Sequence, residues 1–332
     1  MSSLIGIDDI RAAADRIAPH VLRTPTLASP GLTAHLGVPV TLKLELLQRT
    51  GSFKPRASTH KLLSLTDAEK AAGVATVSGG NHGTALAAVA GSLGIAATVV
   101  MAESAPERSK AAVRAAGADL RLTPDMDGAF ALLDELVAGG KTLVHPFDDP
   151  MVLAGHGTVG LEFATDAPDL TDVLVSVGGG AFVSGVATAF RALRPDVRVW
   201  GVETEGADAM TQALAAKSPV PVRLSSIAST LSAPHVSRLT LDHVSELVED
   251  VLVVPDTDAV RGVLTLAEQA KVWTEPAAGC LVPAALRVLE RVGPDARLGL
   301  VVCGGNVTFS DVAAWVRRFD ATPFPPRVPV EV

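Results

Sequence analysis

The chain has 332 residues, of which 48% are hydrophobic and 19% charged, so it can bury a large core and does not belong to the intrinsically disordered proteins. Its formal net charge of −8, without a basic run, argues against a nucleic-acid partner, because phosphate contacts need clustered Lys and Arg. With only two cysteines, no apolar run of the ~18 residues that a membrane helix needs and no signal peptide, we expect a cytoplasmic protein without a disulfide framework or a membrane partner.

Short β-branched runs alternate with alanine-rich helical patterns along most of the chain. The runs predict strands at residues 40–44, 74–77, 97–101, 119–122, 142–144, 173–177, 197–202, 251–254 and 298–302. The helical patterns predict helices at 84–93, 108–116, 128–137, 183–193 and 276–292, with left-handed caps at Gly94 and Gly117. Such alternation is typical of doubly wound, mostly parallel α/β sheets, which bind ligands beyond the carboxyl ends of their strands.

Two polar, turn-rich segments, 65–67 and 148–150, are candidate crossings between domains. We therefore predict a large domain made of residues 1–66 and 151–332, and a small domain, residues 67–150, inserted into it. The small domain would contain the predicted strands between residues 74 and 144.

Three predicted strands end in glycine-rich turns, at residues 78–83, 178–185 and 303–306. In a parallel sheet such turns lie at one edge, where the positive end of a helix dipole suits a phosphate or a carboxylate; for any single turn, a merely tight connection is the alternative. The Walker phosphate-binding pattern is absent. Gly178 and Gly180 match part of the dinucleotide pattern G-x-G-x-x-G, and Glu203 could bind a ribose, but Val183 replaces the third glycine, so a dinucleotide-binding oxidoreductase stays an alternative.

A lysine follows a Gly-Ser turn and an aromatic residue in the segment Gly-Ser-Phe-Lys-Pro-Arg, residues 51–56, after a strand-like stretch at 43–48. A lone lysine is usually a solvated surface group. Together with glycine-rich phosphate sites elsewhere in the chain, however, a lysine that can form a Schiff base points to pyridoxal phosphate.

These motifs resemble the fold-type II pyridoxal-phosphate enzymes, specifically the group of serine/threonine dehydratases (threonine ammonia-lyases) and serine racemases. The resemblance runs from about Arg23 to Asn306, and its motifs are Thr-Gly-Ser-Phe-Lys-x-Arg at 50–56, Ser-x-Gly-Asn-His-Gly at 78–83 and His-Pro-Phe-Asp-Asp-Pro at 145–150, continued at 154–158. It implies a fold like the β-subunit of tryptophan synthase, with two doubly wound sheets, a bound pyridoxal 5′-phosphate and a homodimer.

The resemblance also implies site residues. Lys54 would form the Schiff base and remove the Cα proton, with Phe53 beside the cofactor ring and Cys303 beside its nitrogen. Asn81 would bind the ring 3-hydroxyl, and Ser78 would be a second catalytic residue. The resemblance assigns the phosphate to Gly178, Gly179, Gly180 and Ala181, and the substrate carboxylate to Ser78, Gly79, Gly80, Asn81 and His82.

The chain departs from this family in three places. Ala181 replaces a fourth glycine, which is compatible with phosphate binding if its φ is negative. Related enzymes often bind a divalent cation at a site matching Glu203, the Ala207 carbonyl and position 209, but Ala209 replaces the aspartate and Asp208 would need a local shift, so we predict no metal site. The loop Ser-Ile-Ala-Ser-Thr-Leu, 226–231, differs from the family's Thr-Ile-Ala-Asp-Gly-Leu, which leaves the substrate preference open.

The resemblance implies β-elimination of a small β-hydroxy amino acid, such as L-threonine or L-serine, to a 2-oxo acid and ammonia. A racemase of the same fold is an alternative. A non-catalytic cofactor-binding protein is disfavoured, because Lys54, Ser78 and Asn81 are all present. Gly79 stands where the similar serine racemases have a serine that protonates the second face of the carbanion. Because glycine offers no such proton, we expect little racemisation.

Overall fold

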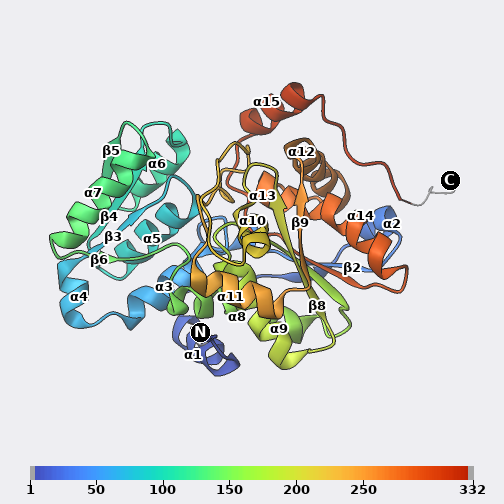
Figure 1. Cartoon of the computed structure of the whole chain (residues 1–332), viewed down its shortest axis with the longest axis horizontal. Coiled ribbons are helices and arrows are strands. Elements are labelled where there is room, and N and C mark those ends of the chain that lie inside the picture. The colour runs from blue at the N-terminus through green and yellow to red at the C-terminus, as the bar shows by residue number, and fades with distance from the viewer. Residues whose placement is uncertain (1–3, 328–332) are drawn as a thin grey trace.

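The computed structural model describes residues 4–327 and contains two β-sheets (Figure 1). The larger sheet has the strand order β1-β2-β10-β7-β8-β9, and the smaller sheet has the order β5-β4-β3-β6. Within this part of the chain, neighbouring strands are parallel except for β1 and β2. The predicted α/β class with two mostly parallel sheets is therefore confirmed.

Each strand predicted from a β-branched run is present, with ends that shift by at most two residues. The larger sheet contains β1 (Thr26–Ala28), β2 (Val40–Lys43), β7 (Asp172–Ser176), β8 (Arg198–Thr204), β9 (Asp250–Val254) and β10 (Leu298–Val301). The smaller sheet contains β3 (Val74–Val77), β4 (Ala97–Ala102), β5 (Asp119–Thr123) and β6 (Thr142–Leu143). The sequence did not predict β1, because three residues are too few to show a strand pattern.

Helices surround both sheets, and α8 packs against both α3 and α9. The helices of the first half of the chain are α1 (Ile7–Ile17), α2 (Pro30–Leu36), α3 (Lys54–Ser64), α4 (Asp67–Ala72), α5 (Asn81–Ser92), α6 (Glu107–Ala115), α7 (Met126–Ala138) and α8 (Pro150–Asp166). Those of the second half are α9 (Ala181–Leu193), α10 (Ala209–Ala216), α11 (Arg238–Leu247), α12 (Asp256–Thr265), the π-helical turn η2 (Leu266–Ala270), α13 (Pro276–Gly279), α14 (Leu281–Val292) and α15 (Phe309–Phe319).

Three predicted elements need correction. The stretch 43–48 is not a continuous strand: β2 ends at Lys43, and a 3₁₀ turn, η1 (Glu45–Leu47), follows. The helix predicted at 84–93 begins earlier, as α5. The helix predicted at 276–292 is divided into α13 and α14, because Pro283 has no N–H to donate to the carbonyl of Gly279.

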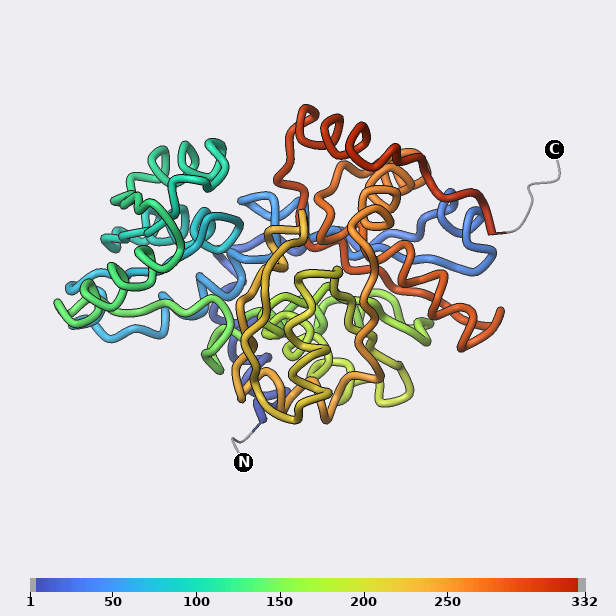
Figure 2. The backbone as a smooth tube through the Cα atoms, turned by 45° about the horizontal axis from the view of Figure 1, so that its top comes forward, coloured from blue at the N-terminus to red at the C-terminus, as the bar shows by residue number. Residues whose placement is uncertain are grey.

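The beginning and the end of the chain meet inside the larger sheet. β2 pairs with β10, which in turn pairs with β7, and Figure 2 shows the blue N-terminal segment beside the orange and red C-terminal part. Buried side chains of these strands, such as Val173 and Leu300, belong to one hydrophobic core with Phe163 and Phe190 of the covering helices. This pairing brings the segment after β2, which carries Lys54, beside the turn after β10.

Gly94 and Gly117 have φ angles of +68° and +77°, which confirms the predicted left-handed caps. No helix within residues 4–327 has the length and hydropathy that crossing a lipid bilayer requires. The four strands of the smaller sheet all lie between residues 74 and 143, but the division into domains at 66/67 and 150/151 stays a prediction.

Candidate active site

The glycine-rich turns that follow β3 and β7 lead directly into two helices. Gly80 is the N-cap of α5 and Gly180 is the N-cap of α9. No described side chain caps either helix, and their first turns contain no acidic residue, whereas α8 and α15 are capped by Asp149 and Thr308. Free N–H groups and the helix dipole therefore make both starts favourable for an anion.

The turn after β10 holds the segment that carries Lys54. Phe53 N donates to Cys303 O at 3.0 Å, and Gly305 N donates to Gly51 O at 3.0 Å. Lys54 is the first residue of α3, so the turn and the helix together fix where its side chain begins.

The Lys54 amine has few polar neighbours. Its Nζ donates to Pro146 O at 3.4 Å and lies 4.9 Å from the centre of the Phe53 ring, which stacks on Phe182 at 3.8 Å. Among the described residues, no carboxylate forms an ion pair with this amine. Burial lowers the pKa of Lys54 to about 8, and the Cys303 thiol opposes this shift only in part. A neutral, nucleophilic amine is therefore accessible near neutral pH.

Arg56 anchors the helix that begins with Lys54. Its guanidinium donates to Glu45 Oε1 at 2.8 Å and Oε2 at 2.9 Å, and to Glu162 Oε1 at 2.8 Å and Oε2 at 2.9 Å. Lys43 Nζ pairs with the same Glu162 at 2.5 Å. Because these partners belong to β2, η1 and α8, the buried cluster fixes α3 relative to the larger sheet.

The start of α9 has no room for side chains at two of its glycines. A Cβ on Gly179 would overlap the ring of Phe147, and a Cβ on Gly180 would lie 2.5 Å from Met210 Cε. Gly180 also has a φ of +92°, which glycine adopts without strain. Ala181 is the first helical residue, so its φ is negative and its N–H remains available. A negative φ is what an alanine at this position needs if the turn is to bind a phosphate.

The Asn81 side chain is held by two neighbours. Its Nδ2 donates to Glu275 Oε1 at 3.0 Å, and its Oδ1 accepts from Asn306 Nδ2 at 2.7 Å. Burial raises the pKa of Glu275, although Thr230 Oγ1, Asn81 and the Asn306 N–H all donate to its carboxylate. Sequence reasoning missed Glu275, whose only signal was a carboxylate in an otherwise apolar stretch, 275–285.

Ser78, Gly79 and His82 lie around the start of α5. Ser78 Oγ accepts from Gly80 N at 3.3 Å. The His82 ring lies 3.1 Å from Thr76 Oγ1 and 3.2 Å from Val144 O, and burial lowers its pKa to about 3, so it is neutral. These contacts direct the ring toward β3 and β6. The group of His82 that can donate to an anion is therefore its backbone N–H and not its ring.

Cys303 begins the turn that holds Phe53. Its Sγ lies 3.8 Å from Ser176 Oγ, and burial raises the pKa of the thiol well above its usual value. The side chain is therefore a neutral thiol, which does not stabilise a positive charge on a ring nitrogen as a carboxylate would.

The residues considered for a divalent cation are used otherwise. Glu203 accepts from Met210 N at 2.8 Å, Thr211 N at 2.9 Å and Thr211 Oγ1 at 2.7 Å, so it caps α10. Burial raises the pKa of Glu203 to about 7. Asp208 accepts from Gln212 Nε2, and no cluster of three or more metal-ligating side chains occurs in the described part of the chain.

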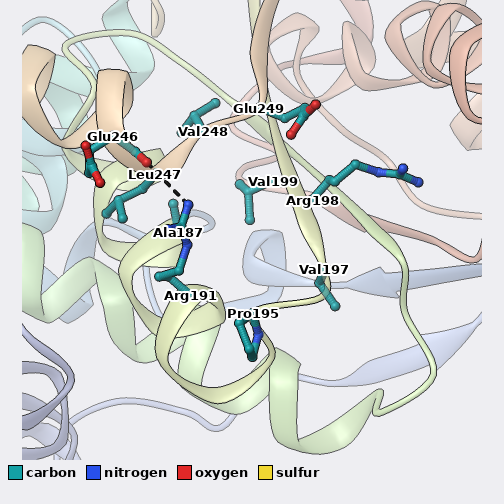
Figure 3. A pocket seen from close by; sticks show the side chains of 10 residues that line it. All are labelled: Ala187, Arg191, Pro195, Val197, Arg198, Val199, Glu246, Leu247, Val248 and Glu249. Atoms are coloured by element: carbon teal, nitrogen blue, oxygen red, sulfur yellow. Dashed lines mark hydrogen bonds between the residues drawn. The ribbon is translucent and has the colours of Figure 1, made fainter.

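A separate surface pocket of about 270 Å³ lies near the amino end of β8, away from the glycine turns at the carboxyl ends of the strands (Figure 3). It is lined by residues near the end of α9 and the start of β8, among them Arg191 and Arg198, and Arg191 donates to the carbonyl of Glu246. Because parallel sheets bind ligands beyond the carboxyl ends of their strands, the glycine turns and not this pocket form the candidate site.

Comparisons with known proteins identify the family of the chain. A sequence model of the family described as "Pyridoxal-phosphate dependent enzyme" matches residues 17–304. The chain is 35% identical to an L-threonine ammonia-lyase of Geobacter sulfurreducens, covering 93% of this chain and 77% of that protein. It is 34% identical to a catabolic L-threonine dehydratase of Escherichia coli K12, with 96% and 98% covered.

A solved structure of maize serine racemase superimposes with a TM-score of 0.88 at 32% identity, and the match covers 95% of this chain and 98% of the racemase. The dinucleotide-binding alternative is therefore set aside. Since the family match spans most of the chain, with Lys54 and the glycine turns after β3 and β7 inside it, the chain belongs to the pyridoxal-phosphate dependent enzymes.

Proposed function

We propose that this chain catalyses the pyridoxal-phosphate-dependent β-elimination of a small β-hydroxy amino acid, such as L-threonine or L-serine, to a 2-oxo acid and ammonia. The observation that carries the proposal is the Lys54 amine, which begins α3 beside the turn after β10, has no carboxylate partner among the described residues and has a pKa lowered to about 8. The relatives named threonine ammonia-lyase and threonine dehydratase support the same reaction class.

The residues present fit the cofactor. Pyridoxal phosphate, when bound, supplies an aldehyde that reacts with amines and a conjugated ring that withdraws electrons from the substrate Cα. The unpaired Lys54 amine suits the aldehyde, and the uncapped start of α9 at Gly180 suits the phosphate. Asn81 would hold the ring hydroxyl, and the neutral Cys303 thiol would lie beside the ring nitrogen.

The start of α5 would bind the substrate carboxylate. Its free N–H groups and dipole favour an anion, and the Ser78 hydroxyl accepts from Gly80 N and so keeps its own proton for a carboxylate oxygen. His82 would contribute its backbone N–H, because its ring is engaged by Thr76 and Val144.

Lys54 would remove the Cα proton. With a pKa of about 8, about one amine in ten is neutral at pH 7, compared with about one in three thousand at the ordinary value of 10.5. The abstracted proton then lies on Nζ, where Pro146 O can accept a hydrogen bond from the ammonium. The β-hydroxyl leaves as water, which together with the proton taken from Cα balances the elimination, and the released enamine hydrolyses to the 2-oxo acid and ammonia.

Racemisation is the second candidate, favoured by the similarity to maize serine racemase. A racemase needs a proton donor on each face of the Cα, whereas elimination needs one base. Gly79 has no side chain, so we assign elimination as the main reaction. A homodimer and a cytoplasmic location remain predictions from the sequence, and we include no divalent cation because Glu203 is engaged by α10.

The test is an assay of the purified holoprotein with L-threonine, L-serine and larger β-hydroxy amino acids, in which 2-oxo acid formation is measured. We expect product from at least one of them, and we expect Lys54→Ala to reduce the rate by about a thousandfold. Lys70→Ala, on the surface helix α4, is the matched control and should retain the activity. The absence of 2-oxo acid from every compound would contradict the proposal.

A further inference from the structure

The loop of residues 226–231 lies between two of the glycine turns. A Cβ added to Gly178 would lie 3.0 Å from Leu231 O, and a Cβ added to Gly80 would lie 3.5 Å from Thr230 Cγ2. The loop is fixed beside the larger sheet through Ser226 Oγ, which donates to Asp256 at the start of α12 at 2.6 Å and lies 2.8 Å from Thr204 Oγ1 of β8. It therefore contacts both the turn assigned to the phosphate and the turn assigned to the substrate carboxylate.

Thr230 uses both branches of its side chain. Its Oγ1 donates to Glu275 Oε1 at 2.8 Å, while its methyl faces Gly80 and lies 3.5 Å from where a Cβ on that glycine would be. Thr230 itself is exposed, whereas Glu275 is buried, so the threonine lies at the mouth of the site with its hydroxyl directed inward.

The hydroxyl also connects the mouth to the interior. Glu275 accepts from Asn81 Nδ2 at 3.0 Å as well as from Thr230, so one carboxylate orients both side chains. Asn81 begins α5 directly after Gly80. A change at Thr230 can thus act in two separable ways, through the volume of the methyl beside Gly80 and through the donor to Glu275.

We propose that Thr230 is a specificity-determining residue: its methyl limits the room beside Gly80 for the substituent on the substrate Cβ, and its hydroxyl donates to Glu275, the carboxylate that also orients Asn81. The inference rests on the proposed function, because it names the feature of the same site that selects among β-hydroxy amino acids. One methyl group in the lining of a site changes the ratio of kcat/KM between a smaller and a larger substrate by about 10-fold or more.

Three substitutions separate the two roles. Thr230→Ser keeps the hydroxyl and removes the methyl, Thr230→Val keeps the shape and removes the donor, and Thr230→Gly removes both. Ser229→Ala is the matched control on the same loop, because the Ser229 side chain has no hydrogen-bond partner among the described residues.

The first measurement is the ratio of kcat/KM for 3-hydroxyleucine or 3-phenylserine to that for L-serine. We expect Thr230→Ser and Thr230→Gly to raise this ratio about tenfold, and Thr230→Val and Ser229→Ala to leave it within about twofold of the wild type. An unchanged ratio in both Thr230→Ser and Thr230→Gly overturns the role of the methyl, while turnover of L-serine shows that the proposed function still holds.

The second measurement does not depend on turnover. The affinity for pyridoxal phosphate and the melting temperature of the cofactor-free protein are compared between Thr230→Val and Thr230→Ser. Loss of a donor to a buried carboxylate predicts about tenfold weaker cofactor binding and a lower melting temperature for Thr230→Val. Equal values for the two variants overturn the role of the hydroxyl, even if no β-hydroxy amino acid is turned over.

Discussion

Arg56→Met would remove the guanidinium that holds Glu45 and Glu162 together beneath α3. The Arg56 and Glu45 side chains are 1% and 0% exposed, and Glu162 is 12% exposed. Lys43 would still pair with Glu162, but Glu45 would be left with the hydroxyl of Thr24 at 2.5 Å. The substitution therefore leaves a buried carboxylate without its cation.

The expected loss of stability follows from the burial of this pair. Removing one partner of a buried ion pair costs about 3–5 kcal/mol, and an unfolding entropy of about 2.1 cal/mol/K per residue gives about 0.7 kcal/mol/K for 332 residues. A loss of about 4 kcal/mol thus lowers the melting temperature by about 6 °C. Calorimetry of the cofactor-loaded protein measures this shift directly.

Arg11→Met is the matched control, because Arg11 pairs with Asp8 at 3.1 Å where the two side chains are 56% and 91% exposed. Such surface pairs contribute less than about 1 kcal/mol, so the melting temperature should fall by no more than about 1.5 °C. The double change Arg56→Met with Glu45→Gln should recover part of the loss by removing the buried charge. Equal shifts for Arg56→Met and Arg11→Met would refute the assignment of α3 anchoring to this cluster.

Three further predictions concern single groups. Wild-type protein incubated with L-serine should form pyruvate with little D-serine, because Gly79 offers no second proton donor; chiral chromatography that finds D-serine forming as fast as pyruvate overturns this. Cofactor-free protein should bind pyridoxal phosphate at a rate that rises with pH around a midpoint of about 8, set by Lys54, and an absorbance-monitored midpoint near 10.5 would contradict the lowered pKa. Because burial raises the pKa of Glu203 to about 7, this group should lower stability by up to about 3 kcal/mol as pH rises from 4.5 through 7. Urea unfolding should show that the free energy of unfolding differs less between pH 5 and pH 8 for Glu203→Gln than for the wild type. The same difference in both proteins would contradict the raised pKa of Glu203.

Local patterns were sufficient for much of the fold. The central strands β3, β4, β7 and β10 were predictable because strands of parallel sheets are buried on both faces and therefore read as continuous apolar segments. The edge strand β5 is mostly exposed, and its alternating apolar residues gave the signal instead. Gly94 and Gly117 were predictable because the left-handed cap has a strong preference for glycine. The division between α13 and α14 could also have been predicted from Pro283, whose missing N–H is a local property.

Long-range contacts explain what the sequence could not predict. Glu275 reaches Asn81 only because the chain after η2 returns to the edge of the larger sheet, and the separation of 194 residues leaves no local signal. The direction of the His82 ring depends on Val144, which lies beyond β4 and β5. Thr230 was noted as a departure from the family, but its contacts with Glu275 and Gly80 required the structure.

The most direct test of the central claim locates the residue that carries the cofactor. The purified protein should be yellow, and reduction with borohydride followed by proteolysis and mass spectrometry should find the pyridoxyl group on the peptide that contains Lys54. Lys54→Ala should remove the visible absorbance, because Lys54 is the amine that begins α3 beside the turn after β10. A reduced adduct on another lysine, with Lys54 unmodified, would contradict the account.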